Sequence, residues 1–256
     1  MGRLDSWESE PIVTWEHLWS VPCLEAYDEL PSTNDRVREL AEEGAAGFTT
    51  VIAETQTAGR GRGGNHWESP PSSGLWMSFL LRPEGVGTPS LTPILVGLAT
   101  ARAIEVTCRA LRPRIKWPND VFVSGLKVGG ILCEGVGPDA VVVGVGINVH
   151  QRGEDFPTGL RGRAISLATA GCPAASRAEL AGGVLKQARD LADPLPDVLD
   201  GGLRSELRHK DALAGRIVRT ETGHEGVAVG VARDGALLIE SGGTRRSIRG
   251  GGVSIV

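Results

Sequence analysis

The chain has 256 residues and a mass of 26.9 kDa, so it can bury a sizeable core without staples. Hydrophobic residues make up 41% and no apolar run is long enough to cross a bilayer, so we expect a cytoplasmic protein with neither membrane span nor signal peptide. A net charge of −4 excludes a general attraction to nucleic acid or acidic membranes, so an anionic ligand must meet a local basic cluster.

The cysteines and histidines show no metal-site or disulfide pattern. No CxxC pair occurs, and the five histidines have no paired ligand spacing. We therefore expect neither structural zinc nor a disulfide framework, and we predict reduced thiols in the core. The four thiols are those of Cys23, Cys108, Cys133 and Cys172.

The first half of the chain predicts alternating strands and helices. Residues 1–24 hold three tryptophans and are expected to pack as an N-terminal extension. Ser32 and Asp35 are spaced like a capping box, which predicts a helix start. Further predicted elements are strands over 50–54 and 74–81, a glycine-rich loop over 59–64 between them, and a buried helix over 92–111 with Pro93 in its first turn.

The second half predicts more strands, and its last part changes character. Residues 115–149 read as successive strands with a turn at Ser124-Gly125, and Ser176 with Glu179 forms a capping box before a helix to about Leu191. After Leu213, short strands are predicted over 216–220, 226–231, 236–240 and 245–248. The sequence thus predicts an α+β protein, with a larger domain over 1–209 and a small all-β barrel or sandwich over 210–256.

The glycine-rich loop, Gly59-Arg60-Gly61-Arg62-Gly63-Gly64, formally satisfies GxGxxG. A dinucleotide-binding turn must open a helix, and Pro70-Pro71 soon afterwards argue against one. No Walker A motif occurs either. Two interpretations remain: a mobile anion-binding loop with two guanidiniums, or an exposed, solvated turn.

Two further segments carry polar groups in apolar surroundings. Lys127 begins an apolar strand beside Gly129 and Gly130, which suggests a cation facing an approaching anion, although an edge strand can also use lysine against aggregation. Asn148 ends the apolar run that starts at 141 and needs a partner, either a ligand or a backbone turn. Asn119 and Asp120 also fit an ordinary Asx turn.

In combination, the motifs resemble those of the biotin protein ligases, over about residues 25–256. The matching segments are Ser32-Thr33-Asn34, the run from Glu54 to Arg62, Trp67, Lys116-Trp117-Pro118-Asn119-Asp120, the run from Gly125 to Leu132, and the run from Gly144 to Asn148. The resemblance implies a mixed β-sheet catalytic domain of the biotin/lipoate ligase type, followed by a small SH3-like β-barrel.

The resemblance also implies an ATP-dependent, AMP-forming ligase. Such an enzyme converts biotin to biotinyl-5′-AMP and transfers biotin to a lysine of the biotin carboxyl carrier domain of an acyl-CoA carboxylase. ATP and Mg²⁺ are the implied cofactors, and the metal's protein ligands stay unassigned because phosphates are expected to bridge it.

Site residues follow from the resemblance, position by position. The implied catalytic residues are Lys127, Arg60 and Arg62, which supply positive charge where two anions react. The implied biotin-binding residues are Ser32, Thr33, Asn34, Gln56, Gly59, Arg60, Trp67, Lys127, Gly129 and Gly130. The implied ATP- and adenylate-binding residues are Arg60, Arg62, Trp67, Lys116, Asn119 and Asn148, with Asp120 as an acid near the metal or the acceptor lysine.

The sequence departs from the family pattern at two places. Asn65 and His66 stand where the loop usually has another basic residue, and no N-terminal DNA-binding domain is present, so we expect a monofunctional enzyme that does not bind DNA. A monomer and a homodimer both remain open. Two alternatives also remain: a lipoate or octanoate ligase of the same fold, and a non-catalytic biotin- or nucleotide-binding module.

Overall fold

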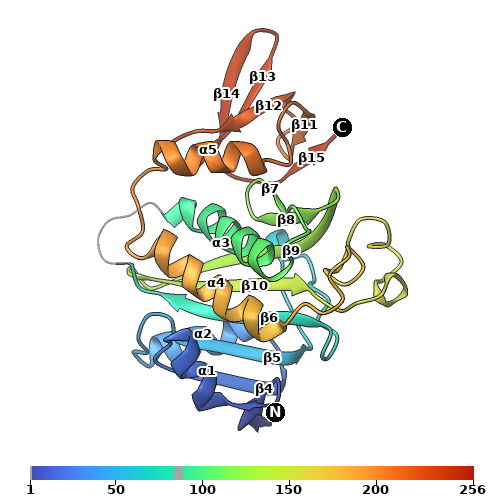
Figure 1. The fold of residues 1–256 in the computed structure, drawn as a ribbon. Helices are drawn as coiled ribbons and strands as arrows, with labels where there is room; N and C mark the ends of the chain where they lie inside the picture. The colour runs from blue at the N-terminus through green and yellow to red at the C-terminus, as the bar shows by residue number, and fades with distance from the viewer. Residues whose placement is uncertain (1, 84–88) are drawn as a thin grey trace.

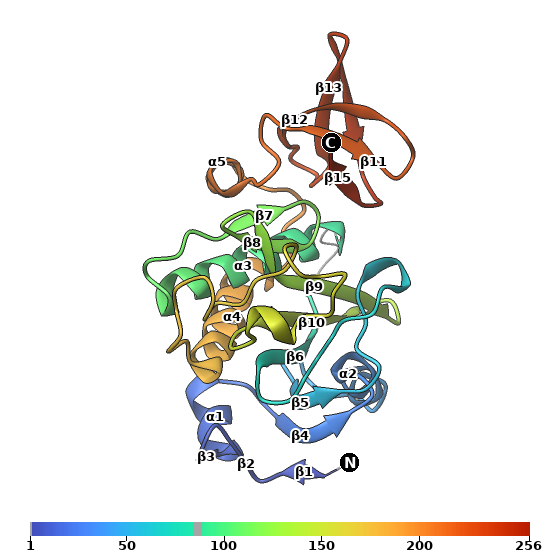
Figure 2. The ribbon, with the colours of Figure 1, turned by 90° about the vertical axis from the view of Figure 1, so that its right-hand side faces the viewer.

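The structure is a computed structural model that describes residues 2–83 and 89–256 (Figures 1 and 2). Its centre is an eight-stranded mixed sheet in the order β1-β4-β5-β6-β10-β9-β8-β7, in which β4 and β5 are parallel and the other pairs antiparallel. The strands are β1 (Arg3–Leu4), β4 (Leu24–Leu30), β5 (Thr50–Gln56), β6 (Gly74–Leu81), β7 (Arg114–Lys116), β8 (Asp120–Val123), β9 (Leu126–Val136) and β10 (Ala140–Asn148). The predicted mixed-sheet α+β fold is confirmed.

Helices cover both faces of this sheet (Figure 2). Helices α3 (Thr92–Thr107) and α4 (Arg177–Ala192) pack on one face, and α2 (Thr33–Glu42) packs on the other. Strand β10 serves both sides because its side chains alternate. Val143, Val145 and Ile147 join the α3–α4 core, whereas Val142 joins the smaller α2 core.

The glycines of β10 make room on the α2 side of the sheet. A Cβ at Gly144 would lie 2.4 Å from Asn34 Oδ1, and one at Gly146 would lie 2.6 Å from the Trp67 ring. Any larger residue would push these side chains out of place. The apolar run of β10 therefore holds a core on one face and leaves a hollow on the other.

The N-terminal extension packs against the sheet, as predicted. It contains β1, a small hairpin of β2 (Ser6–Trp7) and β3 (Glu10–Pro11), and helix α1 (Ile12–Trp19). Trp7 and Trp19 are buried. The buried guanidinium of Arg177 forms ion pairs with Glu8 of the extension and with Glu54 of β5, which ties the extension to the strand that leads into the glycine-rich loop.

The C-terminal part forms a separate antiparallel sheet, next to helix α5 (Gly201–Lys210). Its order is β14-β13-β12-β11-β15, so the described strands form an open sheet and the predicted closed barrel was wrong. The strands are β11 (Ile217–Thr220), β12 (Glu225–Val231), β13 (Leu237–Ser241), β14 (Thr244–Ile248) and β15 (Val253–Ile255). Neither β15 nor α5 was predicted, and the boundary at 209/210, which falls at the end of α5, stays a prediction.

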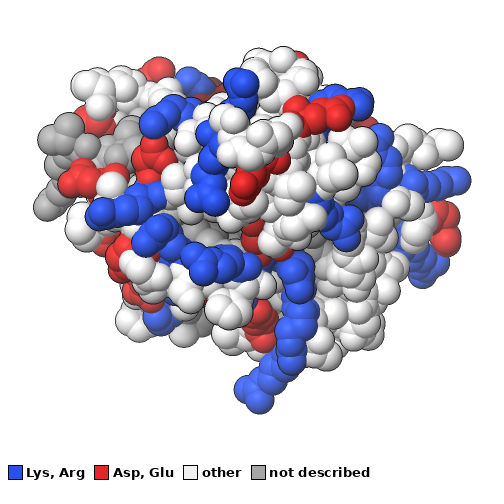
Figure 3. All heavy atoms as spheres, turned by 90° about the horizontal axis from the view of Figure 1, so that it is seen from above, with Lys and Arg blue, Asp and Glu red and all other residues white. Residues whose placement is uncertain are grey.

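The two parts are joined close to the predicted site. The buried indole N–H of Trp117 donates to the C=O of Gly235, in the turn between β12 and β13, at 2.9 Å. Residues 210–256 carry seven Lys or Arg against five Asp or Glu, although the whole chain is acidic. Seen from above in Figure 3, Lys and Arg side chains are more prominent than Asp and Glu. Positive charge is thus concentrated locally.

Two sequence predictions about particular residues were wrong. Cys108 and Cys172 form a disulfide, because the ends of α3 and of the segment before α4 meet with a Cα–Cα distance of 5.8 Å; Cys23 and Cys133 are free thiols. Ser32 does begin α2, but its side chain makes no capping bond and the Asp35 carboxylate turns to Arg60 instead. Across the described residues, no helix is both long and apolar enough to span a membrane.

Candidate active site

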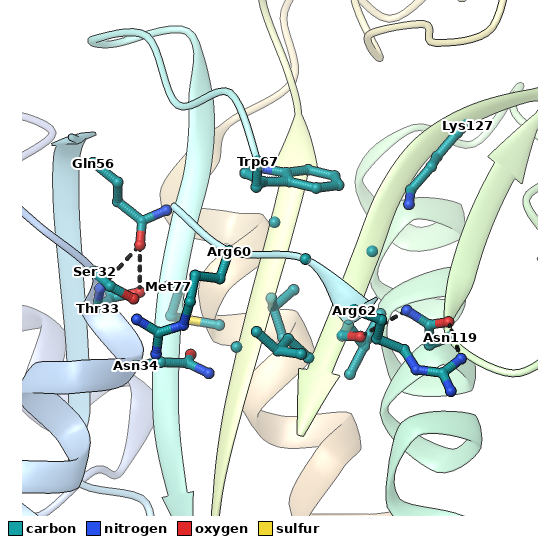
Figure 4. Close-up of a pocket in the computed structure, with 17 residues that line it drawn as sticks. Ser32, Thr33, Asn34, Gln56, Arg60, Arg62, Trp67, Met77, Asn119 and Lys127 are labelled. Carbon is teal, nitrogen blue, oxygen red and sulfur yellow. Dashed lines mark hydrogen bonds between the residues drawn. The ribbon is translucent and has the colours of Figure 1, made fainter. Parts of the chain in front are cut away.

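A narrow cavity lies over β6, β9 and β10, on the α2 side of the sheet (Figure 4). Its volume of about 50 Å³ gives room for roughly three or four water molecules. A bicyclic ligand therefore requires the covering loop to move. The lining residues are Ser32, Thr33, Asn34, Gln56, Arg60, Gly61, Arg62, Trp67, Met77, Asn119, Lys127, Gly130, Ile131, Leu132, Gly144, Val145 and Gly146.

One end of the cavity is polar and uncharged. The amide oxygen of Gln56 accepts from the Thr33 backbone N–H at 2.9 Å and from its hydroxyl at 3.1 Å, while Gln56 Nε2 donates to Ser69 at 2.9 Å. The Thr33 hydroxyl also lies 2.6 Å from that of Ser78. This network fixes the orientation of the Gln56 amide, so hydroxyl and amide groups are held ready for a neutral polar ligand head.

The glycine-rich loop folds back over the cavity as a short hairpin. Gly61 N–H donates to Asn65 C=O at 2.7 Å, and Trp67 N–H donates to Gly59 C=O at 2.9 Å. Gly63 and Gly64, at the tip, have φ values of +65° and +77°, which favour glycine. The tip is the short 3₁₀ turn η1 (Arg62–Gly64), so the expectation that no dinucleotide-type helix starts here is confirmed.

The two arginines anchor this hairpin on opposite sides of the cavity. The Arg60 guanidinium donates to both carboxylate oxygens of Asp35, each at 2.7 Å, and to Glu134 at 3.2 Å. These bonds hold the pKa of Asp35 below its usual range. Arg62 donates to Asn119 Oδ1 at 3.2 Å. The loop is therefore closed by its own charges, and Arg60 lies toward Asn34 in Figure 4.

Trp67 and Lys127 form the lid and the charged wall. Lys127 Nζ lies 5.2 Å from the centre of the Trp67 ring and 2.7 Å from Asp120, whose other oxygen lies 3.9 Å from Lys116 Nζ. The buried Nε1 of Trp67 has no hydrogen-bond partner within the described residues. A lysine side chain that is one-third exposed, beside an unused N–H donor, suits an anionic ligand.

A much larger groove adjoins the cavity, with a volume of about 680 Å³. Lys127, Arg62 and Asn119 line both spaces, so the two spaces meet at these side chains. Lys116 and Arg163 line only the groove. Burial lowers the pKa of Lys116, Asp120 opposes this shift, and the nearby charges of Lys127 and Arg163 reinforce it. The described C-terminal residues contribute to the groove wall at Glu221, Gly252 and Val253.

The structure brings most predicted residues together. Arg60 lines the cavity but not the groove, whereas Asn148 and Asp120 line the groove but not the cavity. Gly59 and Gly129 line neither space: a Cβ on Gly59 would lie 2.5 Å from Trp67 C=O, and one on Gly129 would lie 2.9 Å from Gly146 C=O. The individual roles of all these residues remain predictions.

Several residues of the site were missed from the sequence. Asp35 and Glu134 hold Arg60, and Ser78 completes the polar end. Arg163 and Gln151 belong to the segment between β10 and α4, which contains no strand signal. Only its position after Asn148 could have drawn attention to it.

The groove offers no ready-made metal cage. The described residues contain no group of three or more His, Cys, Asp or Glu side chains that could hold a metal ion. Asp120 is already paired with two lysines. These residues fit Mg²⁺ only as a cation held mainly by phosphate oxygens, as it commonly is in nucleotide sites.

The site agrees with known proteins of similar sequence and fold. The sequence model of the Biotin/lipoate A/B protein ligase family matches residues 28–150. The biotin–[acetyl-CoA-carboxylase] ligase of Mycobacterium tuberculosis is 31% identical over 245 residues, which cover 90% of this chain and 88% of that protein. The chain belongs to the biotin protein ligase family.

Other members of the family match over different lengths. The bifunctional ligase/repressor BirA of Bacillus spizizenii is 41% identical over 149 residues, so the chain matches only about half (45%) of that relative. The structure of the Aquifex aeolicus biotin protein ligase in complex with biotin and ATP superposes with a TM-score of 0.80 and 30% identity, covering 92% of this chain and 99% of that one.

Proposed function

We propose that this protein is an ATP-dependent, AMP-forming biotin–protein ligase. One observation carries the proposal: a small polar cavity and a nucleotide-sized groove meet at Lys127, Arg62 and Asn119. A reaction between a carboxylate and the α-phosphate of ATP needs such a junction, because both reactants are anions.

In this proposal biotin occupies the cavity. Its neutral ureido ring binds at the polar end formed by Ser32, Thr33 and Gln56, which offers hydroxyl and amide groups instead of charges. The ring lies under Trp67, and the carboxylate points to Lys127. Since the cavity is narrow, binding requires the loop to open and then to close, which also shields a reactive mixed anhydride from water.

ATP occupies the groove with its α-phosphate at the junction. A carboxylate oxygen attacks the α-phosphorus, the bond to the β-phosphate oxygen breaks, and biotinyl-5′-AMP and pyrophosphate form. Lys127 and Arg62 stabilise the developing charge, and Lys116 and Arg163 receive the outer phosphates because they line only the groove side. Mg²⁺ would neutralise phosphate charge. In the closed loop Arg60 contributes by anchoring.

The second half-reaction transfers biotin to a lysine of a carrier domain. The amine attacks the biotinyl carbonyl and AMP leaves. The name of the Mycobacterium tuberculosis relative supports a biotin carboxyl carrier domain of an acyl-CoA carboxylase as the acceptor. Asp120 holds Lys127 in place, and its role near the metal or the acceptor lysine is part of the proposal.

The direct test is biotin-dependent exchange of labelled pyrophosphate into ATP, run in parallel with lipoate and octanoate. Exchange with biotin alone supports the proposal. Exchange with an acyl acid instead would assign the protein to lipoate- or octanoate-type chemistry. Binding of biotin without any exchange would make it a binding module and would contradict the proposal.

A further inference from the structure

Gln151 lines the groove with an unsatisfied polar atom. Its side chain is buried, with 2% of the residue exposed, and its Oε1 has no hydrogen-bond partner within the described residues. Buried carbonyl oxygens are nearly always paired, because an unpaired one loses its hydration without compensation. An unpaired oxygen in the wall of a binding groove therefore points to a donor on the ligand.

The Gln151 side chain is also held in position. Its Nε2 donates to Asn148 Oδ1 at 3.3 Å, and its backbone C=O accepts from the Ser166 hydroxyl at 2.6 Å. Asn148 in turn donates through Nδ2 to Ile165 C=O at 3.2 Å. The Asn148 side chain thus bonds to protein groups on both its nitrogen and its oxygen. The acceptor left for a ligand is Gln151 Oε1, with Asn148 as the residue that positions it.

The neighbouring wall of the groove suits a flat aromatic ring. Phe156, Pro157 and Leu160 follow Gln151 in the same segment and line the same groove. The lysines and Arg163 also line it and suit phosphates. A purine nucleotide has this combination of an aromatic base and an anionic tail, and adenine carries an exocyclic amino group that donates hydrogen bonds.

We propose that Gln151 Oε1 accepts a hydrogen bond from the exocyclic amino group of adenine and so makes this groove selective for ATP. The inference rests on the proposed function in placing ATP in the groove. Guanine and hypoxanthine have a carbonyl oxygen at that position, so two acceptors would face each other and the bond would be lost.

The test compares the binding of ATP with that of purine riboside 5′-triphosphate, which lacks the amino group, by titration calorimetry. The wild-type protein should bind ATP about 10- to 100-fold more tightly, the range expected for one hydrogen bond to a buried acceptor. In Gln151→Leu this ratio should fall to near one, while the affinity for biotin stays unchanged and shows that the variant is folded. Gln187→Leu, on α4 and outside the groove, should keep the wild-type ratio.

Equal binding of the two nucleotides by the wild-type protein would overturn the inference, as would a ratio that persists in Gln151→Leu. Loss of the ratio in Gln187→Leu would also overturn it, because the effect would then not belong to this atom. Binding is measured without turnover, so the outcome is independent of pyrophosphate exchange. If exchange is absent but the ATP preference depends on Gln151, the proposed ligase reaction fails while this inference stands.

Discussion

The ion pair between Asp35 and Arg60 should control how long the glycine-rich loop stays closed. The pair forms two hydrogen bonds of 2.7 Å, but the Asp35 and Arg60 side chains are 45% and 35% exposed. Exposed ion pairs contribute below about 1 kcal/mol, and hydrogen bonds to buried charges about 1.5–3 kcal/mol. Asp35→Asn should therefore shift the open–closed equilibrium by about 1–2 kcal/mol, which corresponds to about 5- to 30-fold.

Two measurements follow this equilibrium. Hydrogen exchange of the backbone amides in residues 59–67 should accelerate in Asp35→Asn, and biotin should dissociate faster by about the same factor of 5 to 30. Glu134 still accepts from Arg60 at 3.2 Å in this variant, so the loop should keep part of its protection. Glu39→Gln removes the same charge from α2, away from the loop, and should change neither quantity.

The opposite result would refute this reasoning. If Asp35→Asn accelerated pyrophosphate exchange while biotin dissociation and loop protection stayed at wild-type values, Arg60 would act on phosphate and Asp35 would restrain it. Unchanged exchange of the loop amides on addition of biotin would likewise contradict a loop that closes over the ligand.

Three further predictions follow from the site and the core. Lys127→Ala should lower the rate of pyrophosphate exchange by about 10²- to 10³-fold, the loss typical of one transition-state charge contact, and should be the most damaging single change. Arg163→Ala should raise the KM for ATP severalfold without changing the KM for biotin, because Arg163 lines only the groove. Burial raises the pKa of Glu54, but its bonds to Arg177 outweigh this and leave that pKa lowered, so the resulting stability is present above about pH 4 and is lost on acidification. Urea unfolding between pH 7 and pH 3 should show this loss, and Glu54→Gln should reduce it.

Matched variants separate these effects from general damage. Lys186→Ala, on the exposed side of α4, should leave exchange unchanged, and Arg246→Ala, on β14, should leave the KM for ATP unchanged. An Arg163→Ala variant whose biotin KM rises as much as its ATP KM would indicate a misplaced segment and would contradict a phosphate contact. A pH dependence of unfolding that is identical in Glu54→Gln would remove this carboxylate from the explanation.

Local patterns were sufficient to predict most of the fold. The predicted strand over 74–81 coincides with β6, and the Ser124-Gly125 turn between β8 and β9 has positive φ at both residues. These features depend on neighbours in sequence. Strand β15 was missed because three residues between glycines and the chain end give no alternating pattern, and the predicted barrel failed because closure depends on strands distant in sequence.

The site was predictable where motifs carry it and unpredictable where distant residues pair. The loop, the lysines and the Thr33–Gln56 end all belong to motifs recognisable in the sequence. The Asp35 carboxylate reads locally as a helix cap, and only the folded sheet shows that Arg60, 25 positions later, takes it. The same holds for the disulfide of Cys108, whose partner is 64 residues away and reaches it through the packing of α3 and α4.

The central claim is that biotin and ATP meet and react at Lys127. It is tested most directly by mixing the protein with biotin and ATP, quenching, and quantifying biotinyl-5′-AMP by mass spectrometry in wild type and in Lys127→Ala. The account predicts about one adenylate per chain in the wild-type protein and little in the variant over the same time. A wild-type protein that binds both ligands but forms no adenylate would contradict it, as would a variant that forms adenylate at the wild-type rate.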